Sequence, residues 1–434
     1  MVNMYIKIII IAAVVIIGIF GILSLLAGSI CPPPGWQGPR PPWCEVPETG
    51  GEFQYRELDY ITESYPETDK ILITGIGTMD MWGNPHLLVD LGEDPGNNYE
   101  STMERIGTIG SEALYLTDFR KINDDFTISE VPKSTIPSAI TLSQEEMNNV
   151  VNAAKKNRQN TVILITNLYD PGFTYTKWLG QDISQTPYSR FSSADPETRM
   201  EYFNIMWPEW KEAILLEAEK AETAGVDYLI INPGDTSFLY YIDLGELSSR
   251  YEELIPDVRE KFSGKTGFGG LLPYVANDEF KVLDDVDFVV VFWDTNGDYK
   301  AREIFADTTQ DAEDIEASFV EWLSLPEWAN LAGKETYISV TLPSYDGALQ
   351  EGWIEPVQSE DRWTRDDAEQ ALGYEGLFRA LYNGDYNISG VFSYGYWWSD
   401  QVYPVSKDLR NDIMHSIRQK DAESVFYKWS GIFG

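Results

Sequence analysis

The sequence predicts an α/β fold: a single (β/α)8 TIM barrel that follows an N-terminal transmembrane helix and a short Pro-rich disulfide collar. Eight short apolar runs alternate with helical patterns after residue 68, an uncharged apolar segment stands near the N-terminus, and the two cysteines enclose a Pro-rich stretch. The 434 residues, 43% of them hydrophobic, can bury one large core. We therefore divide the chain into an anchor (1–30), a collar and linker (31–67) and a barrel (68–434).

The anchor is predicted from residues 8–28, which carry no charge. A helix of this length spans roughly 30 Å of hydrocarbon. Lys7 precedes it and acidic residues follow, so the positive-inside rule leaves the N-terminus in the cytoplasm and the barrel outside the cell. Two alternatives are a cleaved signal peptide, which would have an unusually long apolar region and no clean A-x-A site, and lipid attachment at Cys31, where Ile30 replaces the expected small residue.

The collar is predicted from Cys31 and Cys44, the only two cysteines, which bracket the stretch PPPGWQGPRPPW. Two cysteines outside a membrane favour a disulfide, and closing a loop this short contributes about 3 kcal/mol. A metal site is not expected, because two thiols lack further ligands and the chain has only two histidines. Pro-rich chain favours extended geometry, so this segment is predicted to be a rigid spacer.

The barrel is predicted from strands that are near-continuously apolar, as strands buried on both faces must be. Helical patterns separate several of them at 142–157, 200–225 and 364–384, and Pro208 is expected either to kink the second pattern or to start a new helix. Eight strands that alternate with helices favour a closed barrel over an open sheet. The predicted strands are 71–79, 112–119, 161–170, 227–235, 267–275, 287–294, 336–346 and 388–398.

Several classes of function are excluded by charge and motif. The net charge of −38 argues against nucleic acid and anionic lipid surfaces as partners. The acidic residues are spread along the chain and are expected to lie on a solvated surface. The chain has no phosphate-binding glycine loop, no G-x-S-x-G elbow and no H-E-x-x-H motif, and the glycines of the predicted strands are interpreted as close-packing positions. His86 and His415 are too few for a histidine-based catalytic or metal site and are expected to be surface or structural residues, so no cofactor is predicted.

The ends of the predicted strands gather aromatic residues and carboxylates with almost no cations. Aromatic rings stack on sugar rings, and carboxylates bind sugar hydroxyls or hydrolyse glycosidic bonds. For any one aromatic residue, packing between barrel and helices is an equal alternative. The candidate substrate-binding residues are Trp82, Tyr169, Trp178, Trp293, Tyr345, Trp353, Tyr396, Trp397 and Trp398.

Six stretches carry a resemblance to a known family: 133–171, 206–235 (MWPEWKEAILLEAEKAETAGVDYLIINPGD), PSYDGA at 343–348, EQALGYEGLFRAL at 369–381, GVFSYGYWW at 390–398 and SIRQKDAESVFYKW at 416–429. Over residues 70–430 the sequence resembles the clan A glycoside hydrolases, especially the β-mannanase-like barrels of glycoside hydrolase family 113. The resemblance implies an acid/base glutamate at the end of strand four and a nucleophilic glutamate at the end of strand seven. On that register the two positions read Gly234 and Ser339, so both catalytic glutamates are substituted.

Three functions remain open. We expect a membrane-anchored, extracellular, non-hydrolytic carbohydrate-binding or cell-surface structural barrel. The alternative is an active β-mannanase-like glycosidase that uses Asp235 with a recruited carboxylate, Asp346 or Glu351 or else Asp294. A second alternative is a self-associating subunit of a surface assembly or filament. The triplet beginning at Asn387 is compatible with glycosylation outside the cell.

Overall fold

The computed structural model describes residues 53–61, 63–78, 95–131, 141–170, 182, 184–234, 236–352, 363–396 and 413–433. The predicted anchor and the Cys31–Cys44 pair lie outside these residues. Among the helices that are described, none is both long enough and apolar enough to cross a membrane.

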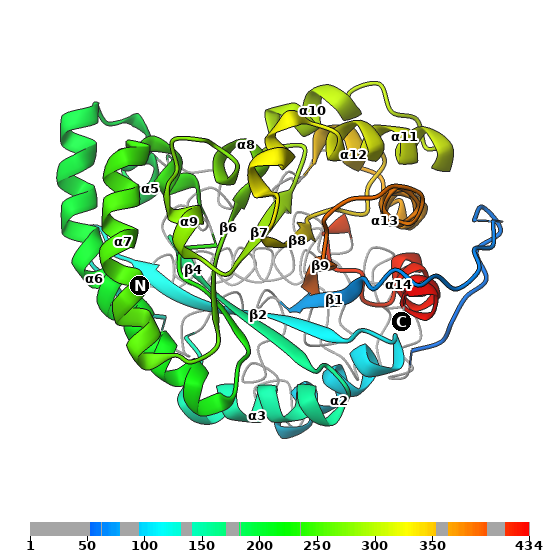
Figure 1. The fold of residues 1–434 in the computed structure, drawn as a ribbon, viewed down its shortest axis with the longest axis horizontal. Helices are drawn as coiled ribbons and strands as arrows, with labels where there is room; N and C mark the ends of the chain where they lie inside the picture. Colours follow the sequence, from blue (N-terminus) through cyan, green and yellow to red (C-terminus); the bar gives the residue numbers. More distant parts are fainter. Residues whose placement is uncertain are drawn as a thin grey trace, which may run out of the picture.

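Eight parallel strands form a closed barrel (Figure 1), as predicted. Each pairs with the next around the ring, and β1 closes it by pairing with both β2 and β9. A ninth strand, β3 (Ile128–Glu130), extends the sheet by pairing antiparallel with β2 and was not predicted. The barrel strands are β1 (Ile73–Thr78), β2 (Ala113–Ile122), β4 (Thr161–Tyr169), β5 (Tyr228–Ile230), β6 (Lys265–Leu271), β7 (Phe288–Trp293), β8 (Glu335–Val340) and β9 (Gly390–Tyr396).

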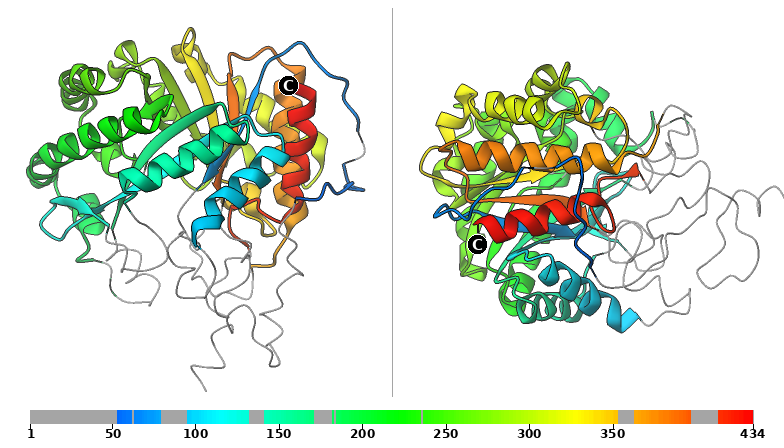
Figure 2. Two further views of the ribbon diagram at one scale, coloured as in Figure 1. Left: turned by 90° about the horizontal axis from the view of Figure 1, so that it is seen from below. Right: turned by 90° about the vertical axis from the view of Figure 1, so that its right-hand side faces the viewer.

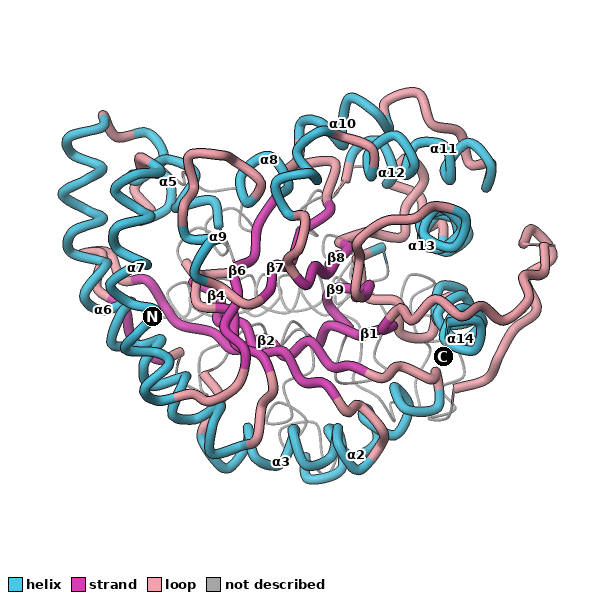
Figure 3. Tube along the Cα trace, viewed as in Figure 1, coloured by secondary structure: helices cyan, strands magenta, loops and turns pink. Residues whose placement is uncertain are grey.

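Helices surround the barrel, and α2, α3, α6, α7, α13 and α14 lie along its outer side (Figures 1 to 3). The longer helices are α2 (Pro95–Thr108), α3 (Gln144–Lys156), α6 (Pro196–Ala224), α7 (Leu244–Lys261), α11 (Ala312–Leu323), α13 (Asp367–Asn383) and α14 (Asp421–Phe433). The shorter elements are α5 (Pro187–Ser193), α8 (Leu272–Val275), α9 (Val282–Asp285), α10 (Tyr299–Phe305), α12 (Ala348–Glu351) and the 3-10 helices η3 (Thr236–Tyr241) and η4 (Pro326–Leu331).

Local sequence signals explain where the predicted helices begin. Ser143 and Glu146 form a reciprocal capping box at the start of α3. The Asp195 side chain caps α6, and the proline that follows it needs no hydrogen bond at the first helical position. Pro208 lies inside α6, which continues past it, so the alternative of a new helix start is wrong.

The barrel interior is filled by aromatic rings that lie against glycines on the neighbouring strand. A Cβ atom at Gly75 would lie 2.0 Å from the Phe392 ring, and one at Gly267 would lie 2.4 Å from the Phe288 ring. The strand glycines are therefore close-packing positions, as predicted, because any side chain there would displace a core ring.

The described chain begins with a segment that lies along α14. The Arg56 amide donates to Ser424 Oγ at 3.0 Å, and the Tyr60 hydroxyl donates to Asp421 at 2.6 Å. Residues 53–61 are thus held against the last helix of the barrel. Asn387, before β9, is exposed, and its side-chain amide donates to the Lys334 carbonyl.

Candidate functional site

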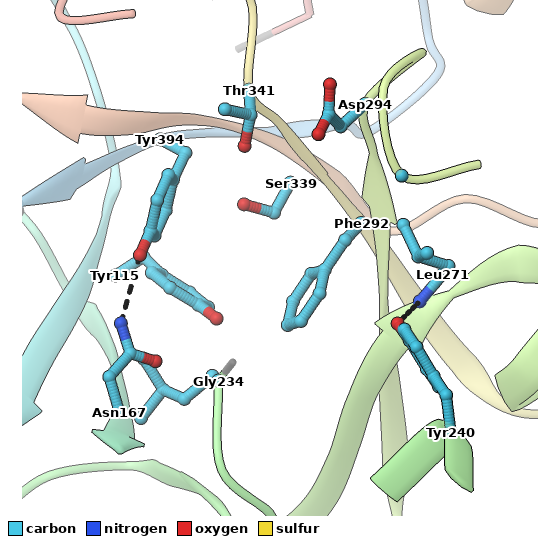
Figure 4. Close-up of a pocket in the computed structure, with 12 residues that line it drawn as sticks. Tyr115, Asn167, Gly234, Tyr240, Leu271, Phe292, Asp294, Ser339, Thr341 and Tyr394 are labelled. Atoms are coloured by element: carbon cyan, nitrogen blue, oxygen red, sulfur yellow. Dashed lines mark hydrogen bonds between the residues drawn. The ribbon is translucent and has the colours of Figure 1, made fainter. Parts of the chain in front are cut away.

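A cavity of about 230 Å³ opens at the carboxyl ends of the barrel strands (Figure 4). Active sites of this fold lie at that end, because the loops after the strands converge there. The cavity is lined by residues of β2, β4, β6, β7, β8 and β9 and of the segments that follow β5, β7 and β8. These residues are Tyr115, Ile165, Asn167, Gly234, Tyr240, Leu271, Phe292, Asp294, Gly297, Ser339, Thr341 and Tyr394.

Four aromatic side chains form much of the cavity wall. Tyr115 is fully buried and meets Tyr394 edge to face, with ring centroids 6.3 Å apart. Phe292 projects from β7, and the Tyr240 hydroxyl accepts a hydrogen bond from the Leu271 amide. Burial raises the pKa of Tyr115 well above its usual value, so its hydroxyl keeps its proton.

The polar lining consists mainly of neutral groups. Asn167 Nδ2 donates to the Tyr394 hydroxyl at 3.0 Å. Asn167 Oδ1 and the Tyr115 hydroxyl are buried and have no hydrogen-bond partner within the part of the chain that the structure describes. The Ser339 hydroxyl points into the space between Tyr394 and Phe292 (Figure 4). Such groups can bind the hydroxyls of a ligand that brings its own donors.

Asp294, directly after β7, contributes the one carboxylate among the lining residues that the structure describes. Its Oδ1 accepts a hydrogen bond from the Asn296 amide at 3.0 Å, which fixes the carboxylate at the upper edge of the view in Figure 4. The other eleven described residues of the lining carry no charge.

Gly234 and Ser339, the two positions where the family resemblance expects glutamates, line this same cavity. At position 234 the space for a side chain is already filled: a Cβ atom there would lie 1.6 Å from Asn167 Oδ1 and 2.9 Å from Ile165 Cδ1. Asp235, the next residue and our candidate acid, lies outside the described residues.

The other two candidate catalytic carboxylates do not line the cavity. Glu351 is exposed at the end of α12. Asp346 is exposed, and one of its oxygens lies within 4.8 Å of oxygens of Asp366 and Glu369, an arrangement that a metal ion could use. The Gln310 amide already donates to all three carboxylates, which accounts for their convergence without a metal.

Three of the predicted sugar-binding aromatics are fully buried between strands and helices, contrary to expectation. Trp293 packs against Phe305 and Phe319, with centroids 5.1 and 5.2 Å away. The Tyr345 hydroxyl donates to the Gly352 carbonyl, and the Tyr396 hydroxyl donates to Glu423. All three have 0% exposure and leave no ring face for a ligand.

Side-chain alternation explains this correction. Successive residues of a strand point to opposite faces, so Phe292 points into the barrel and Trp293 points out. On β9 the positive φ of Gly395, 86°, shifts the strand so that Tyr394 lines the cavity and Tyr396 packs behind it. Tyr169 is half-buried against Phe119. The remaining candidates, Trp82, Trp178, Trp353, Trp397 and Trp398, lie outside the described residues.

His415 is buried, in keeping with a structural residue, and it lies next to Tyr394 of the cavity wall. Its ring stacks on Tyr394 with centroids 5.6 Å apart, and neither ring nitrogen has a partner among the described residues. Burial, with a smaller contribution from Lys420, lowers the pKa of His415 to about 3, so the imidazole is neutral. His86 lies outside the described residues.

A buried charge cluster lies on the outer side of β2, away from the cavity. Lys220 of α6 contacts Asp118 at 3.3 Å and Glu217 at 2.9 Å, and Glu217 also pairs with Arg120. Burial and the neighbouring Glu217 raise the pKa of Asp118 to about 7, against the opposing effect of Lys220. Asp118 therefore joins barrel to helix and does not face the cavity.

Comparison with known proteins identifies the fold. As a sequence, the chain matches no protein-family profile and no curated protein. As a structure, it is similar to the glycoside hydrolase family 113 β-mannanase from Alicyclobacillus acidocaldarius, with a TM-score of 0.56 and 14% identity over 84% of this chain and 98% of that one. A second family 113 β-1,4-mannanase gives a TM-score of 0.52 and 14% identity over 83% of this chain and 99% of that one.

A glycoside hydrolase family 5 mannosidase from Rhizomucor miehei gives a TM-score of 0.52 and 12% identity over 84% of this chain and 94% of that one. The structural neighbours are thus clan A β-mannanases and mannosidases, as the family resemblance implied. At these identities the likeness establishes a glycoside-hydrolase-like barrel fold.

Proposed function

We propose that this chain is a non-hydrolytic carbohydrate-binding barrel, held on the cell surface by its N-terminal segment. The observation that carries the proposal is the composition of the cavity. Its described lining residues combine aromatic rings and neutral hydrogen-bonding groups with a single carboxylate, and they include Gly234 and Ser339, the two positions where the family resemblance expects glutamates.

Hydrolysis with retention or inversion uses two carboxyl groups on opposite sides of the scissile bond. A serine in place of the nucleophile needs a neighbouring base to attack a sugar. On the neighbouring strands Ser339 is in register with Phe292 and Phe392, neither of which is a base, and among the described lining residues Asp294 is the one carboxylate. Aromatic rings and neutral donors, in contrast, are sufficient to bind a sugar ring without breaking it.

The surface location rests on the uncharged segment 8–28 and on the Pro-rich stretch between Cys31 and Cys44. Both precede the described barrel by enough chain to hold it clear of a membrane. Assembly into a surface array is compatible with this arrangement, and crosslinking that captures only monomers would argue against it.

The second candidate function is that of an active glycosidase. It is supported by Asp294, a carboxylate that lines the cavity. Asp294 could act together with Asp235 if the latter faces the same space. Inverting hydrolysis tolerates a separation of roughly 10 Å between such a pair.

The experiment uses the full chain in detergent, incubated with manno-, gluco- and xylo-oligosaccharides. Binding is followed by calorimetry and products by mass spectrometry. Binding without product supports the proposal. Product formation that is lost in both Asp235→Asn and Asp294→Asn would establish the glycosidase instead. Failure to bind any saccharide would overturn both candidates.

A further inference from the structure

The hydroxyl of Tyr115 borders the cavity and has no hydrogen-bond partner in the part of the chain that the structure describes. We propose that this hydroxyl recognises one hydroxyl of the bound sugar, so that the cavity discriminates against a sugar deoxygenated at that carbon. The inference rests on the proposed function, because the cavity must receive a sugar ring. It goes further by assigning a recognition residue and the ligand group that it contacts.

The position of Tyr115 places its hydroxyl at the deep end of the cavity. Tyr115 is in register with Ile163, which precedes the lining residue Asn167 along β4, so it lies farther from the carboxyl ends of the strands. Its side chain is fully buried, and Figure 4 shows the hydroxyl directed into the cavity. The rings of Phe392 and Tyr394 pack on it, with centroids 5.7 and 6.3 Å away, and hold it in this direction.

Other fully buried tyrosines of this chain have hydroxyls that the protein itself satisfies. Tyr251, under α7, packs its ring against Trp207 and Phe268 and is not among the described lining residues. Tyr115 differs from the other fully buried tyrosines that are described in combining an unpartnered hydroxyl with a place in the cavity wall. Those whose hydroxyls donate to a carbonyl or a carboxylate are Tyr337, Tyr345, Tyr374 and Tyr396.

The chemistry of this hydroxyl suits a sugar hydroxyl. Burial raises the pKa of Tyr115 well above its usual value, so the group keeps its proton and can both donate and accept. Ile165 and Phe292 border the same cavity with apolar atoms, so a hydrogen bond there is strengthened by its apolar surroundings. A deoxy analogue would leave the Tyr115 hydroxyl buried without a partner, which is unfavourable.

The test uses the full chain in detergent and the shortest saccharide of the manno, gluco and xylo series that binds to it. Analogues of this parent saccharide each lack one hydroxyl, taken in turn over every ring. Dissociation constants are measured by calorimetry for the wild type, for Tyr115→Phe and for Tyr251→Phe. The last is the matched control, because it also removes a fully buried hydroxyl, on a residue that is not among the described lining residues.

In the wild type we expect one analogue to bind about tenfold more weakly than the parent, because it lacks the hydroxyl that meets Tyr115. In Tyr115→Phe the parent should lose about the same factor, and this analogue should then bind as well as the parent. Tyr251→Phe should behave as the wild type. An unchanged deficit in Tyr115→Phe, or an equal weakening of the parent and every analogue, overturns the inference and leaves the proposed function standing.

Denaturation of the free protein gives a second readout that needs no ligand. Tyr115→Phe should leave the urea midpoint unchanged or raise it, whereas Tyr374→Phe should lower it, because the Tyr374 hydroxyl donates to the Val340 carbonyl at 3.2 Å. A midpoint that falls in Tyr115→Phe as far as in Tyr374→Phe would show that the protein supplies the partner, and would overturn the inference. Absence of binding to every saccharide overturns the proposed function, and the inference with it.

Discussion

Gly234→Ala tests whether the Asn167 side chain really occupies the space in front of residue 234. The new Cβ would lie 1.6 Å from Asn167 Oδ1, so the amide must move by roughly 2 Å to reach ordinary contact distance. That movement breaks the hydrogen bond to Tyr394, worth about 0.5–1.5 kcal/mol, and adds a packing strain of about 1–3 kcal/mol. Alanine restricts the unfolded chain and returns about 0.4–1 kcal/mol. The net expectation is a loss of about 1–3 kcal/mol in the free energy of unfolding.

The assay is equilibrium denaturation of the variant and of the same change in an Asn167→Ala background. Removing the amide should reduce the cost of Gly234→Ala by half or more, with the Ile165 contact at 2.9 Å remaining. Gly431→Ala is the matched control: its Cβ would meet nothing within 4 Å in the interior of α14, so alanine should stabilise by about 0.5–1 kcal/mol. Equal costs of Gly234→Ala in the two backgrounds would refute the reasoning.

Three further predictions concern burial and packing. The raised pKa of Asp118, about 7, contributes stability that is present below pH 4 and is lost as pH rises through 7, so the stability of wild type relative to Asp118→Asn should fall across that window; a flat difference would contradict the pKa. The pKa of His415, lowered to about 3, acts in the opposite sense, so relative to His415→Phe the wild type should gain stability as pH rises from 3 to 6.5, and a loss would contradict it. Gly75→Ala places a methyl group 2.0 Å from Phe392 and should cost about 1–3 kcal/mol in denaturation; no measurable cost would contradict the described interior packing.

The barrel could be predicted from sequence because its strands are buried on both faces. Runs such as FVVVFW in β7 are apolar at every position, and their regular alternation with helices leaves few other architectures. The same property prevents prediction of which residues face inward. Since both faces are apolar, nothing in the sequence distinguishes Phe292, which lines the cavity, from Trp293, which does not.

The residues that sequence reasoning missed are set by contacts between distant parts of the chain. Asn167 becomes a cavity residue through its bond to Tyr394, 227 positions away. Asp118 follows an apolar run, as catalytic carboxylates of this fold do. It instead forms a buried ion pair with Lys220 of α6. The change of side-chain direction at Gly395 could have been predicted in part, because a glycine inside a strand is typical of a β-bulge.

The two positions that the family reserves for glutamates differ in what a larger side chain would meet. At 339 the hydroxyl borders an open cavity, whereas at 234 the amide of Asn167 fills the space. A glutamate could therefore be introduced at 339 by one change, but at 234 only together with a change at Asn167. The neutral lining groups cannot take over proton transfer, because amides do not titrate near neutral pH and burial raises the pKa of Tyr115 further. Hydrolysis uses two carboxyl groups, and the described part of this lining supplies one, so the proposal of a binding site depends on which carboxylates the loops outside the described residues add to the cavity.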